Sequence, residues 1–396
     1  MMKEILQFLN KTCNVLAFPD VGQDVVRSLI IMGNENGDIP RWPIANMYTG
    51  GMFGDNANQI IEDALAKGLS NFNVSLAYEL MRLSAFEERG NAGRSGITDY
   101  IKLGYVPDDV TSGGPALTLA YSYNDWALAQ VAQRLGKLED YEVLMARSKN
   151  YKQVWSPRRQ FMCARKRNAE SPDCPPIPLT DLPYYFIEGN VWHYTWAVEH
   201  DPEGLMDLFG SPEAFSDKLE ACLSQGAEVE RELFSKNVLP NPYYWAGNEH
   251  DLLHPWLFHV ANRSDLTEYW TRWLMDYKYG TAPDGLPGND DFGTLSAWFL
   301  FAAMGFYPVT GRPFYILGSP LFSHMTLHLP SVAGGRGMRA GEDTVSLDIV
   351  AHNWSPTAYY VSLVELNGEV LEQHRVMHHQ LIRGGRLEFW LQEEPF

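Results

Sequence analysis

The sequence of 396 residues has little cysteine, no long apolar run and no long basic run. Its four cysteines show no C-x-x-C spacing, which argues against a zinc site; they are too few for a disulfide scaffold but enough for two disulfides. No segment approaches the roughly 18 to 20 apolar residues of a membrane span, and the amphipathic N-terminal stretch lacks the apolar core of a signal peptide. The net charge of −18 argues against nucleic acid as a partner.

Apolar and aromatic residues, by contrast, are abundant. They make up 45% and 13% of the chain, with 12 Trp and 20 Tyr, so a large core can be buried. Buried rings account for most aromatic residues, but flat aromatic faces also suit the binding of sugar rings. The length fits one large domain or two ordinary ones.

The apolar pattern changes once along the chain. Helices are expected at residues 22–33, 56–68, 74–87, 115–136, 138–150, 188–199, 212–224, 250–262, 265–277 and 292–304. After about residue 306 the segments alternate or run apolar, and Asn367-Gly368 is typical of a hairpin turn. We therefore predict a mainly α fold, with a helical part over residues 1–305 and a small β-rich module over residues 306–396.

Three loops place acids and amides beside aromatic residues at loop-to-helix junctions. We call them the EGN loop (residues 184–196), the GNE loop (residues 243–256) and the GND loop (residues 285–299), after the motifs EGNVWHYTW, GNEHDLLHPW and GLPGNDDFGTLSAWF that they contain. Long, aromatic loops of this kind tend to be functional. If the helices pair around a centre, we expect the three loops to converge at one end.

The adjacent Asp290 and Asp291 of the GND loop have two interpretations. Asp is favoured at helix N-termini, where it accepts hydrogen bonds from free backbone N–H groups. Two acids together equally suit a metal site or a catalytic base, because like charges side by side need a cation or good hydrogen bonds. Glu188 is likewise either a helix cap or a catalytic acid, and Glu249 is either an ordinary surface acid or a metal ligand.

Separated carboxylates among aromatic rings are what glycoside hydrolysis requires. One protonated carboxyl donates a proton to the leaving oxygen, and a second, ionised carboxyl activates water or attacks the anomeric carbon. Glu188 and the Asp290/Asp291 pair provide these groups, while Asn248 and Glu249 add oxygen ligands that suit Ca²⁺. The residues therefore favour a carbohydrate enzyme.

Taken in order, the three motifs closely resemble those of the glycoside hydrolase family 92 α-mannosidases. The resemblance extends upstream and downstream, to IPRWPIAN at 39–46, MFGDNANQIIEDA at 52–64, LGYVP at 103–107, YNDWALAQVAQRLGK at 123–137, LVELNGEVL at 363–371 and IRGGRLEF at 382–389. It covers nearly the whole chain from about residue 20, which is more specific than any single motif.

This resemblance implies an (α/α)6 barrel and a Ca²⁺-dependent, inverting exo-α-mannosidase that acts on α-1,2-linked mannose of N-glycans or mannans. It places the general acid at Glu188, the general base at Asp290 or Asp291, and the metal ligands at Asn248, Glu249 and Asp291. The expected sugar contacts are Trp42, Asp55, Trp192, His193, Glu249 and Asn289. The expected partners are mannose-containing oligosaccharides or glycoproteins. Members of this family are often secreted or periplasmic, although no signal peptide is evident here.

The sequence also departs from the family pattern. Members usually carry a large N-terminal β-sandwich that packs on the barrel, which we do not find in this sequence, and we expect about ten helices where the barrel needs twelve. His193 stands where the family usually has Gln, and Leu252 and Leu253 stand where it usually has two His. Two alternatives therefore remain: a truncated, non-catalytic remnant that binds mannosides or is unstable alone, and another (α/α)6 sugar enzyme of different specificity.

Overall fold

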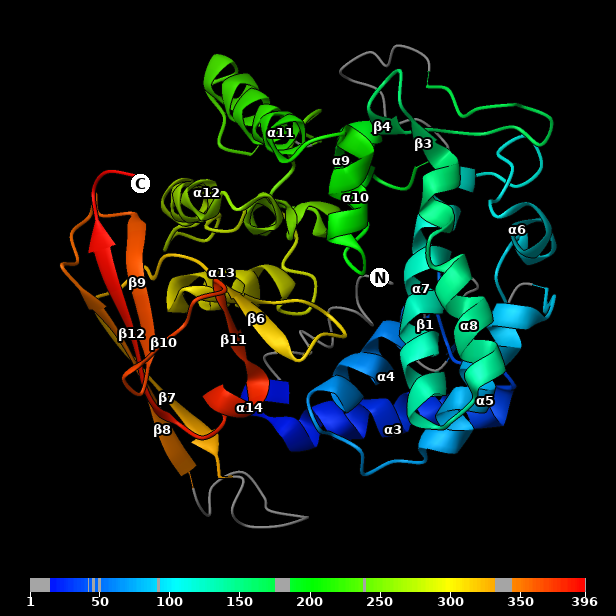
Figure 1. Cartoon of the computed structure of the whole chain (residues 1–396), viewed down its shortest axis with the longest axis horizontal. Helices are drawn as coiled ribbons and strands as arrows, with labels where there is room; N and C mark the ends of the chain where they lie inside the picture. Colours follow the sequence, from blue (N-terminus) through cyan, green and yellow to red (C-terminus); the bar gives the residue numbers. More distant parts are fainter. Residues whose placement is uncertain are drawn as a thin grey trace.

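The computed structural model describes residues 15–41, 43–44, 47–48, 51–90, 93–174, 186–237, 240–331 and 344–395. Over these residues the chain is mainly helical up to Met304 and mainly β from Phe306 onward (Figure 1). No helix within these ranges has the length and apolar character that a membrane crossing needs.

Most of the predicted helices are present where the apolar pattern placed them. The α-helices are α3 (Pro19–Asn36), α4 (Ala57–Ala66), α5 (Val74–Phe86), α6 (Ile97–Leu103), α7 (Gly114–Arg134), α8 (Leu138–Arg147), α9 (Val191–Tyr194), α10 (Pro202–Phe209), α11 (Pro212–Glu232), α12 (Ser264–Lys278), α13 (Thr294–Met304) and α14 (His378–Leu381). Three 3₁₀ helices accompany them, namely η1 (Asn150–Val154), η2 (Glu249–Asp251) and η3 (His254–Ala261).

Two predicted helices are wrong in type or length. The helix expected at 188–199 is only the short α9, because extended backbone at Asn190 precedes it. The helix expected at 250–262 is the pair η2 and η3, with Pro255 in the first turn of η3. Helices α6 and α10 were not predicted; both are short, at 7 and 8 residues, which leaves too few turns for a clear periodicity.

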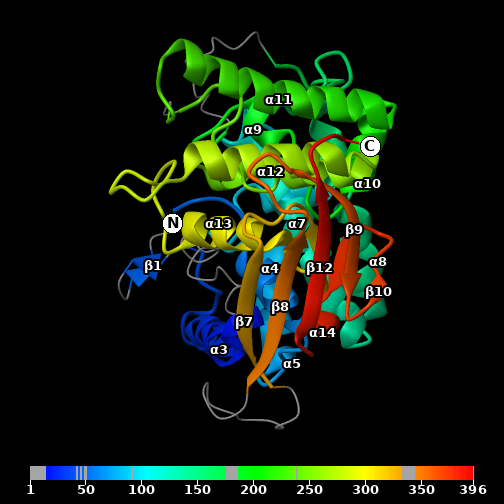
Figure 2. The ribbon, with the colours of Figure 1, turned by 90° about the vertical axis from the view of Figure 1, so that its left-hand side faces the viewer.

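Helices that are close together in the sequence mostly pack against one another. Helix α3 packs against α4 and α5, α7 packs against α4, α5 and α8, and α11 and α12 both pack against η3. Figures 1 and 2 show α11, α12 and α13 stacked in that order, with the large sheet along one side of the stack. The chain between α11 and α12 carries the GNE loop and the chain from α12 into α13 carries the GND loop, whereas the EGN loop contains α9 and precedes α10.

The C-terminal strands form two sheets. The larger has the order β10-β9-β12-β8-β7, built from β7 (His324–Pro330), β8 (Thr344–His352), β9 (Tyr360–Leu366), β10 (Glu369–Val370) and β12 (Gly385–Gln392). The smaller contains β5 (Phe306–Pro308), β6 (Phe314–Leu317) and β11 (Arg375–Met377), and two-stranded pairs form from β1 (Pro43–Ile44) with β2 (Met47–Tyr48) and from β3 (Trp155–Ser156) with β4 (Phe161–Met162). Positive φ at Asn367 and Gly368 forms the predicted hairpin turn between β9 and β10.

The helical and β-rich parts share a continuous interior. Val309 and Ile316 lie in the same apolar cluster as the helices, whereas Phe301 and Met304 of α13 pack into the cluster under the sheet. Polar contacts join the parts as well: Asp63 on α4 accepts a hydrogen bond from the backbone N–H of Gly311 at 2.8 Å. The change from helix to strand at residue 305 therefore occurs inside one packed body.

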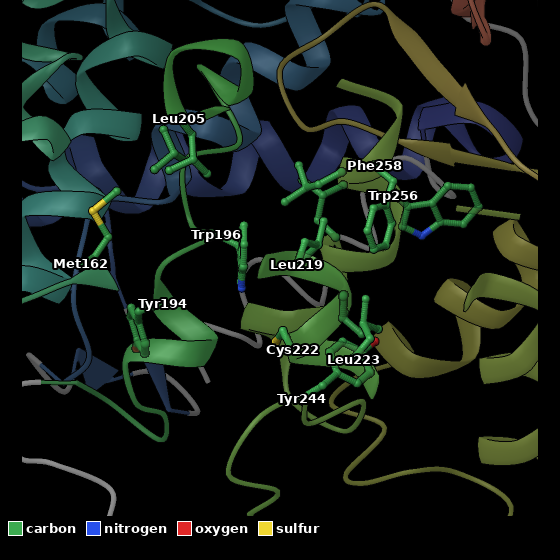
Figure 3. Close-up of a cluster of buried hydrophobic side chains, with 14 of the residues drawn as sticks. Met162, Tyr194, Trp196, Leu205, Leu219, Cys222, Leu223, Tyr244, Trp256 and Phe258 are labelled. Atoms are coloured by element: carbon green, nitrogen blue, oxygen red, sulfur yellow. The ribbon is translucent and has the colours of Figure 1, made fainter. Parts of the chain in front are cut away.

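A cluster of large buried side chains includes residues of the EGN and GNE loops (Figure 3). Trp196 stacks on Phe209 with parallel rings, and Trp256, in η3, is fully buried. Burying one such side chain contributes roughly 1.5–3 kcal/mol. A disulfide between Cys163 and Cys174 lies in the same cluster, Cys222 is a buried free thiol, and Cys13 lies outside the described residues.

Candidate active site

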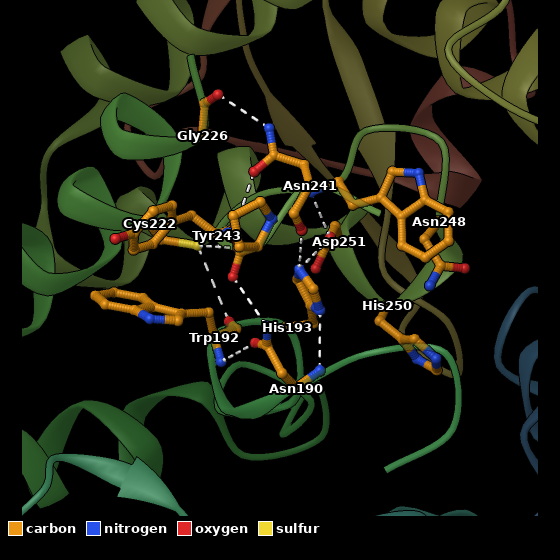
Figure 4. Close-up of polar contacts among 12 residues, drawn as sticks. Asn190, Trp192, His193, Cys222, Gly226, Asn241, Tyr243, Asn248, His250 and Asp251 are labelled. Atoms are coloured by element: carbon orange, nitrogen blue, oxygen red, sulfur yellow. Dashed lines mark hydrogen bonds and ion pairs between the residues drawn. The ribbon is translucent and has the colours of Figure 1, made fainter. Parts of the chain in front are cut away.

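The EGN loop is fixed by a network of hydrogen bonds around Asn190 (Figure 4). The Asn190 side chain accepts from the Trp192 N–H at 2.8 Å, as the cap of α9, and donates to the Pro242 carbonyl at 2.9 Å. Its backbone N–H donates to Nδ1 of His193 at 3.0 Å. Short polar side chains at this position satisfy backbone groups that a helix start leaves free.

His193, one of the expected sugar contacts, lies inside the protein. It is fully buried, and because Nδ1 accepts from Asn190, Nε2 carries the proton and donates to the Asn241 carbonyl at 2.9 Å. Burial lowers the pKa of His193 to about 4, so the ring is neutral at ordinary pH. This neutral ring, bonded on both nitrogens, joins the EGN loop to the backbone of Asn241, just before the GNE loop.

Glu188 lies on the exposed side of this network. Its backbone is left-handed, with φ of 49°, a conformation that a non-glycine residue adopts only where its surroundings hold it. The Asn248 side chain donates to the Glu188 carbonyl at 2.6 Å, and the Tyr194 hydroxyl donates to the preceding Ile187 carbonyl at 2.7 Å. The GNE loop and α9 therefore both fix the backbone of the predicted acid.

The acids of the EGN and GNE loops both influence the hydroxyl of Tyr194. Burial raises the pKa of Tyr194, and the negative charges of Glu188, Glu249 and Asp251 raise it further. All three carboxylates thus act on one phenol. The predicted meeting of these two loops is present in the structure.

The GNE and GND loops meet through their glycines. A Cβ added to Gly247 would lie 2.3 Å from the Pro287 carbonyl oxygen, and one added to Gly288 would lie 2.8 Å from the Gly247 carbonyl oxygen. Only glycine permits this approach of two backbones. The indole N–H of Trp298 also donates to the Leu252 carbonyl at 2.9 Å, which ties α13 to the GNE loop.

The two adjacent acids of the GND loop have different surroundings. The Asp290 carboxylate accepts from both the backbone N–H and the hydroxyl of Ser296, at 3.0 and 2.8 Å, and so caps α13. Asp291 begins a run of left-handed residues, with φ of 47°. Within the described ranges its half-buried carboxylate has no hydrogen-bond donor. One acid therefore serves the helix, and the other is available for chemistry.

The predicted metal ligands offer hard oxygen donors. Asn248 is buried, and its amide oxygen accepts from the Glu249 N–H at 3.2 Å. No group of three or more His, Cys, Asp or Glu side chains is placed to hold a metal in the described part of the chain. A cation here would therefore be bound by amide and backbone oxygens together with Glu249 and Asp291, a donor set that fits Ca²⁺ better than a transition metal.

Trp42, Asp55 and Asn289, which are also predicted sugar contacts, have three different locations. Trp42 lies outside the described residues. Asp55 accepts from Ser84 and from Arg94, at 2.7 and 2.6 Å, in an ionic network that includes the buried Asp125. A sugar contact at Asp55 stays a prediction. Asn289 is exposed on the GND loop.

Trp192, in the EGN loop, is half-buried. Its ring meets Phe161 and Tyr243 edge-on, at centroid distances of 4.8 and 5.2 Å, and the Lys218 ammonium lies 4.4 Å from its centroid. These neighbours hold the ring in place by packing and by a cation–π contact.

Sequence reasoning missed two residues that organise the site. Tyr194 is one aromatic residue among several in the EGN motif, and nothing in the sequence singles it out. Asp251 of the GNE motif is fully buried, accepts from the Trp245 N–H at 2.7 Å and lies 3.3 Å from Nδ1 of His254. The acid-and-histidine spacing was visible in the sequence, but its burial depends on tertiary packing.

The chain is similar to known proteins. A family model described as the glycosyl hydrolase family 92 catalytic domain matches residues 11–393. A curated relative from Arthroderma benhamiae, described as an uncharacterized secreted glycosidase, is 26% identical over 374 residues, which make up 86% of this chain and 45% of the relative.

Solved structures agree. The family GH92 inverting mannosidase of Bacteroides thetaiotaomicron is 30% identical, with a TM-score of 0.86, over 98% of this chain and 53% of that chain. A family GH92 α-mannosidase of the same organism, solved in complex with mannoimidazole, is 25% identical with a TM-score of 0.86, over 100% of this chain and 51% of that chain.

These likenesses confirm the predicted fold class, a mainly helical (α/α)6-type arrangement followed by C-terminal strands. The chain spans about half the length of the relatives it matches. Since the family model covers nearly all of its residues, the chain belongs to glycosyl hydrolase family 92.

Proposed function

We propose that the chain is the catalytic part of an exo-acting α-mannosidase that hydrolyses its substrate with inversion. The observation that carries the proposal is the convergence of the three loops: the Asn248 side chain donates to the Glu188 carbonyl, and Gly247 packs against the backbone of residues 287 and 288. Two structural relatives are named as mannosidases, and one of them binds mannoimidazole. The proposed substrates are α-1,2-linked mannose residues at the ends of N-glycans or mannans.

Glu188 is the proposed general acid. Its side chain is exposed, so it can approach the oxygen that links mannose to the leaving sugar, while its backbone is held by the GNE loop. Proton donation to that oxygen removes the need to expel an alkoxide. As the C–O bond breaks, positive charge develops on the anomeric carbon.

Asp291 is the proposed general base, in preference to Asp290. The Asp290 carboxylate is engaged by Ser296 at the start of α13, whereas no donor within the described ranges engages Asp291. Inversion requires this carboxylate to activate a water molecule on the face of the sugar opposite the acid. Asp290 then fixes the start of α13 and thereby holds the neighbouring Asp291 in place.

Asn248, Glu249 and Asp291 are the proposed ligands of Ca²⁺. When bound, the cation would supply positive charge for two sugar hydroxyls and would offset the charge of the neighbouring acids. Asn248 retains its own contact with the Glu188 carbonyl in this scheme.

The test is release of mannose from α-1,2-mannobiose by the purified chain in Ca²⁺, followed by proton NMR of the first-formed anomer. We expect β-mannose to appear first, and Glu188→Gln to lower kcat by about 10²- to 10⁴-fold. Glu139→Gln, which changes an exposed acid on α8, is the matched control. If folded protein binds mannose but releases none, the chain is a mannoside-binding protein and the proposed activity is wrong.

A further inference from the structure

Tyr194 is the centre of the segment that carries the proposed acid. Its ring stacks on Phe186 at a centroid distance of 4.6 Å, and its hydroxyl donates to the Ile187 carbonyl at 2.7 Å. Gly189 lies against the ring edge, because an added Cβ there would be 2.9 Å from Cε2 of Tyr194. Residues 186, 187 and 189 therefore all contact one side chain, and Glu188 lies between them.

The hydrogen-bond directions around Tyr194 follow from its single proton. The Ile187 carbonyl can only accept, so the phenol proton is directed to it. Nε2 of His250, 3.0 Å from the same hydroxyl, must then donate, which requires the Nε2–H form of that ring. The His250 ring also lies over the Tyr194 ring, with centroids 4.3 Å apart.

His250 belongs to the GNE loop, directly after Glu249. It therefore links that loop to the EGN loop through Tyr194, in parallel with the bond from Asn248 to the Glu188 carbonyl. The two links hold consecutive carbonyls, those of Ile187 and Glu188. A left-handed residue between fixed carbonyls has few other conformations open to it.

We propose that Tyr194 and His250 are positioning residues for the general acid, which set the direction of the Glu188 carboxyl by fixing the carbonyl before it. This inference rests on the proposed function, because it assigns a purpose to the held backbone only if Glu188 donates the proton. Neither residue touches the sugar or transfers a proton to it.

The proposal predicts a dependence on the leaving group. Protonation by Glu188 matters most for a poor leaving group such as a second mannose, and little for 2,4-dinitrophenolate, which departs without a proton. Loss of acid positioning therefore slows disaccharide hydrolysis and spares the activated aryl mannoside. A general loss of folding or of sugar binding slows both substrates equally.

The experiment measures kcat and KM of Tyr194→Phe on α-1,2-mannobiose and on 2,4-dinitrophenyl α-mannoside. We expect kcat on the disaccharide to fall about 10- to 100-fold, with KM unchanged, and kcat on the aryl mannoside to fall less than about threefold. Tyr105→Phe is the control, since Tyr105 is equally buried and its hydroxyl also donates to backbone carbonyls, at 3.2 Å, away from the loops.

A pair of changes at His250 tests the second member. His250→Phe keeps a ring over Tyr194 but removes the N–H donor, and we expect it to reproduce the selective loss on the disaccharide. His250→Gln restores an N–H donor of similar reach, and we expect it to recover most of the rate.

The outcomes separate the inference from the function on which it rests. If the unaltered chain hydrolyses neither substrate, the proposed function is wrong. If it hydrolyses both and Glu188→Gln shows the selective loss, but Tyr194→Phe slows both substrates equally or neither, the positioning role is wrong and the function stands.

Discussion

At the scale of single residues, Asp290 and Asp291 are adjacent in sequence but differ in their hydrogen bonds. We expect Asp291→Asn to lower kcat by about 10²- to 10⁴-fold with little change in stability, because an amide cannot accept the proton of water. Asp290→Asn keeps an oxygen for Ser296 and should cost about 1 kcal/mol or less of unfolding free energy. Kinetics on α-1,2-mannobiose and thermal unfolding measure the two effects.

The reverse order of severity would contradict this assignment. If Asp290→Asn abolished turnover while Asp291→Asn kept most of it, the base would be Asp290, and its bonds to Ser296 would be catalytic positioning contacts. Ser296→Ala then decides whether the cap alone matters, because it removes only the hydroxyl donor.

Sequence reasoning identified the chemical groups of the site better than their surroundings. The motifs indicated Glu188, Asn248, Glu249 and the acid pair, because these residue types are tied to carbohydrate and Ca²⁺ chemistry. Burial is set by packing between distant segments. For that reason the sequence does not reveal that His193 is buried and forms an internal hydrogen-bond bridge.

At the scale of elements, local signals predicted a helix wherever they were strong. Ser211 caps α11 by accepting from the Ala214 N–H at 3.2 Å, as its sequence context indicated. The GNE loop shows the limit, because its apolar spacing fits an α-helix but Pro255 and the need to seat Asp251 inside the core give 3₁₀ turns. The sequence pattern does not show which of these effects prevails, because tertiary contacts can override local helix propensity.

Helix α12 and strand β9 are joined by a buried acid that makes stability depend on pH. Glu268 on α12 is 2% exposed and accepts from the Val361 N–H at 3.0 Å. Burial raises its pKa from 4.5 to about 8. The folded state therefore holds a proton that the unfolded state loses between these pH values, and the unfolding free energy falls as pH rises through that window.

We expect Glu268→Gln to reduce this pH dependence, because the amide stays neutral while still accepting from Val361. The slope should decrease by up to about 1.4 kcal/mol per pH unit between pH 7 and 8. Below pH 7 part of the slope remains, since burial also raises the pKa of Glu62, to about 7. Denaturant unfolding at several pH values measures this slope, with Glu139→Gln as the control. Parallel curves of unfolding free energy against pH for the two variants would contradict the prediction.

At the scale of the whole molecule, the site depends on contacts between segments far apart in the sequence. Glu188 reaches Asn248 across 60 residues, and Asp63 on α4 reaches the backbone of Gly311 across 248. The order of the motifs indicated the fold class through the family resemblance, but composition and periodicity alone gave only a helical part and a β-rich part. The contacts that bring the loops together had no local signal.

The proposed Ca²⁺ ligands lie on the GNE and GND loops, so cation binding should stabilise the folded chain as a whole. A ligand that binds only the folded state at 100 times its Kd adds about 2.7 kcal/mol to the unfolding free energy. We expect a higher Tm in millimolar Ca²⁺ than in a chelator, and a smaller increase with Mg²⁺, because Mg²⁺ gives up its water reluctantly.

Glu249→Gln should abolish most of the shift in Tm that Ca²⁺ causes, whereas Glu139→Gln should keep it. Since Tm is read without substrate, an unchanged Tm in Ca²⁺ would remove the cation from the proposed site even if turnover were observed. A shift that survives Glu249→Gln would place the cation elsewhere in the chain.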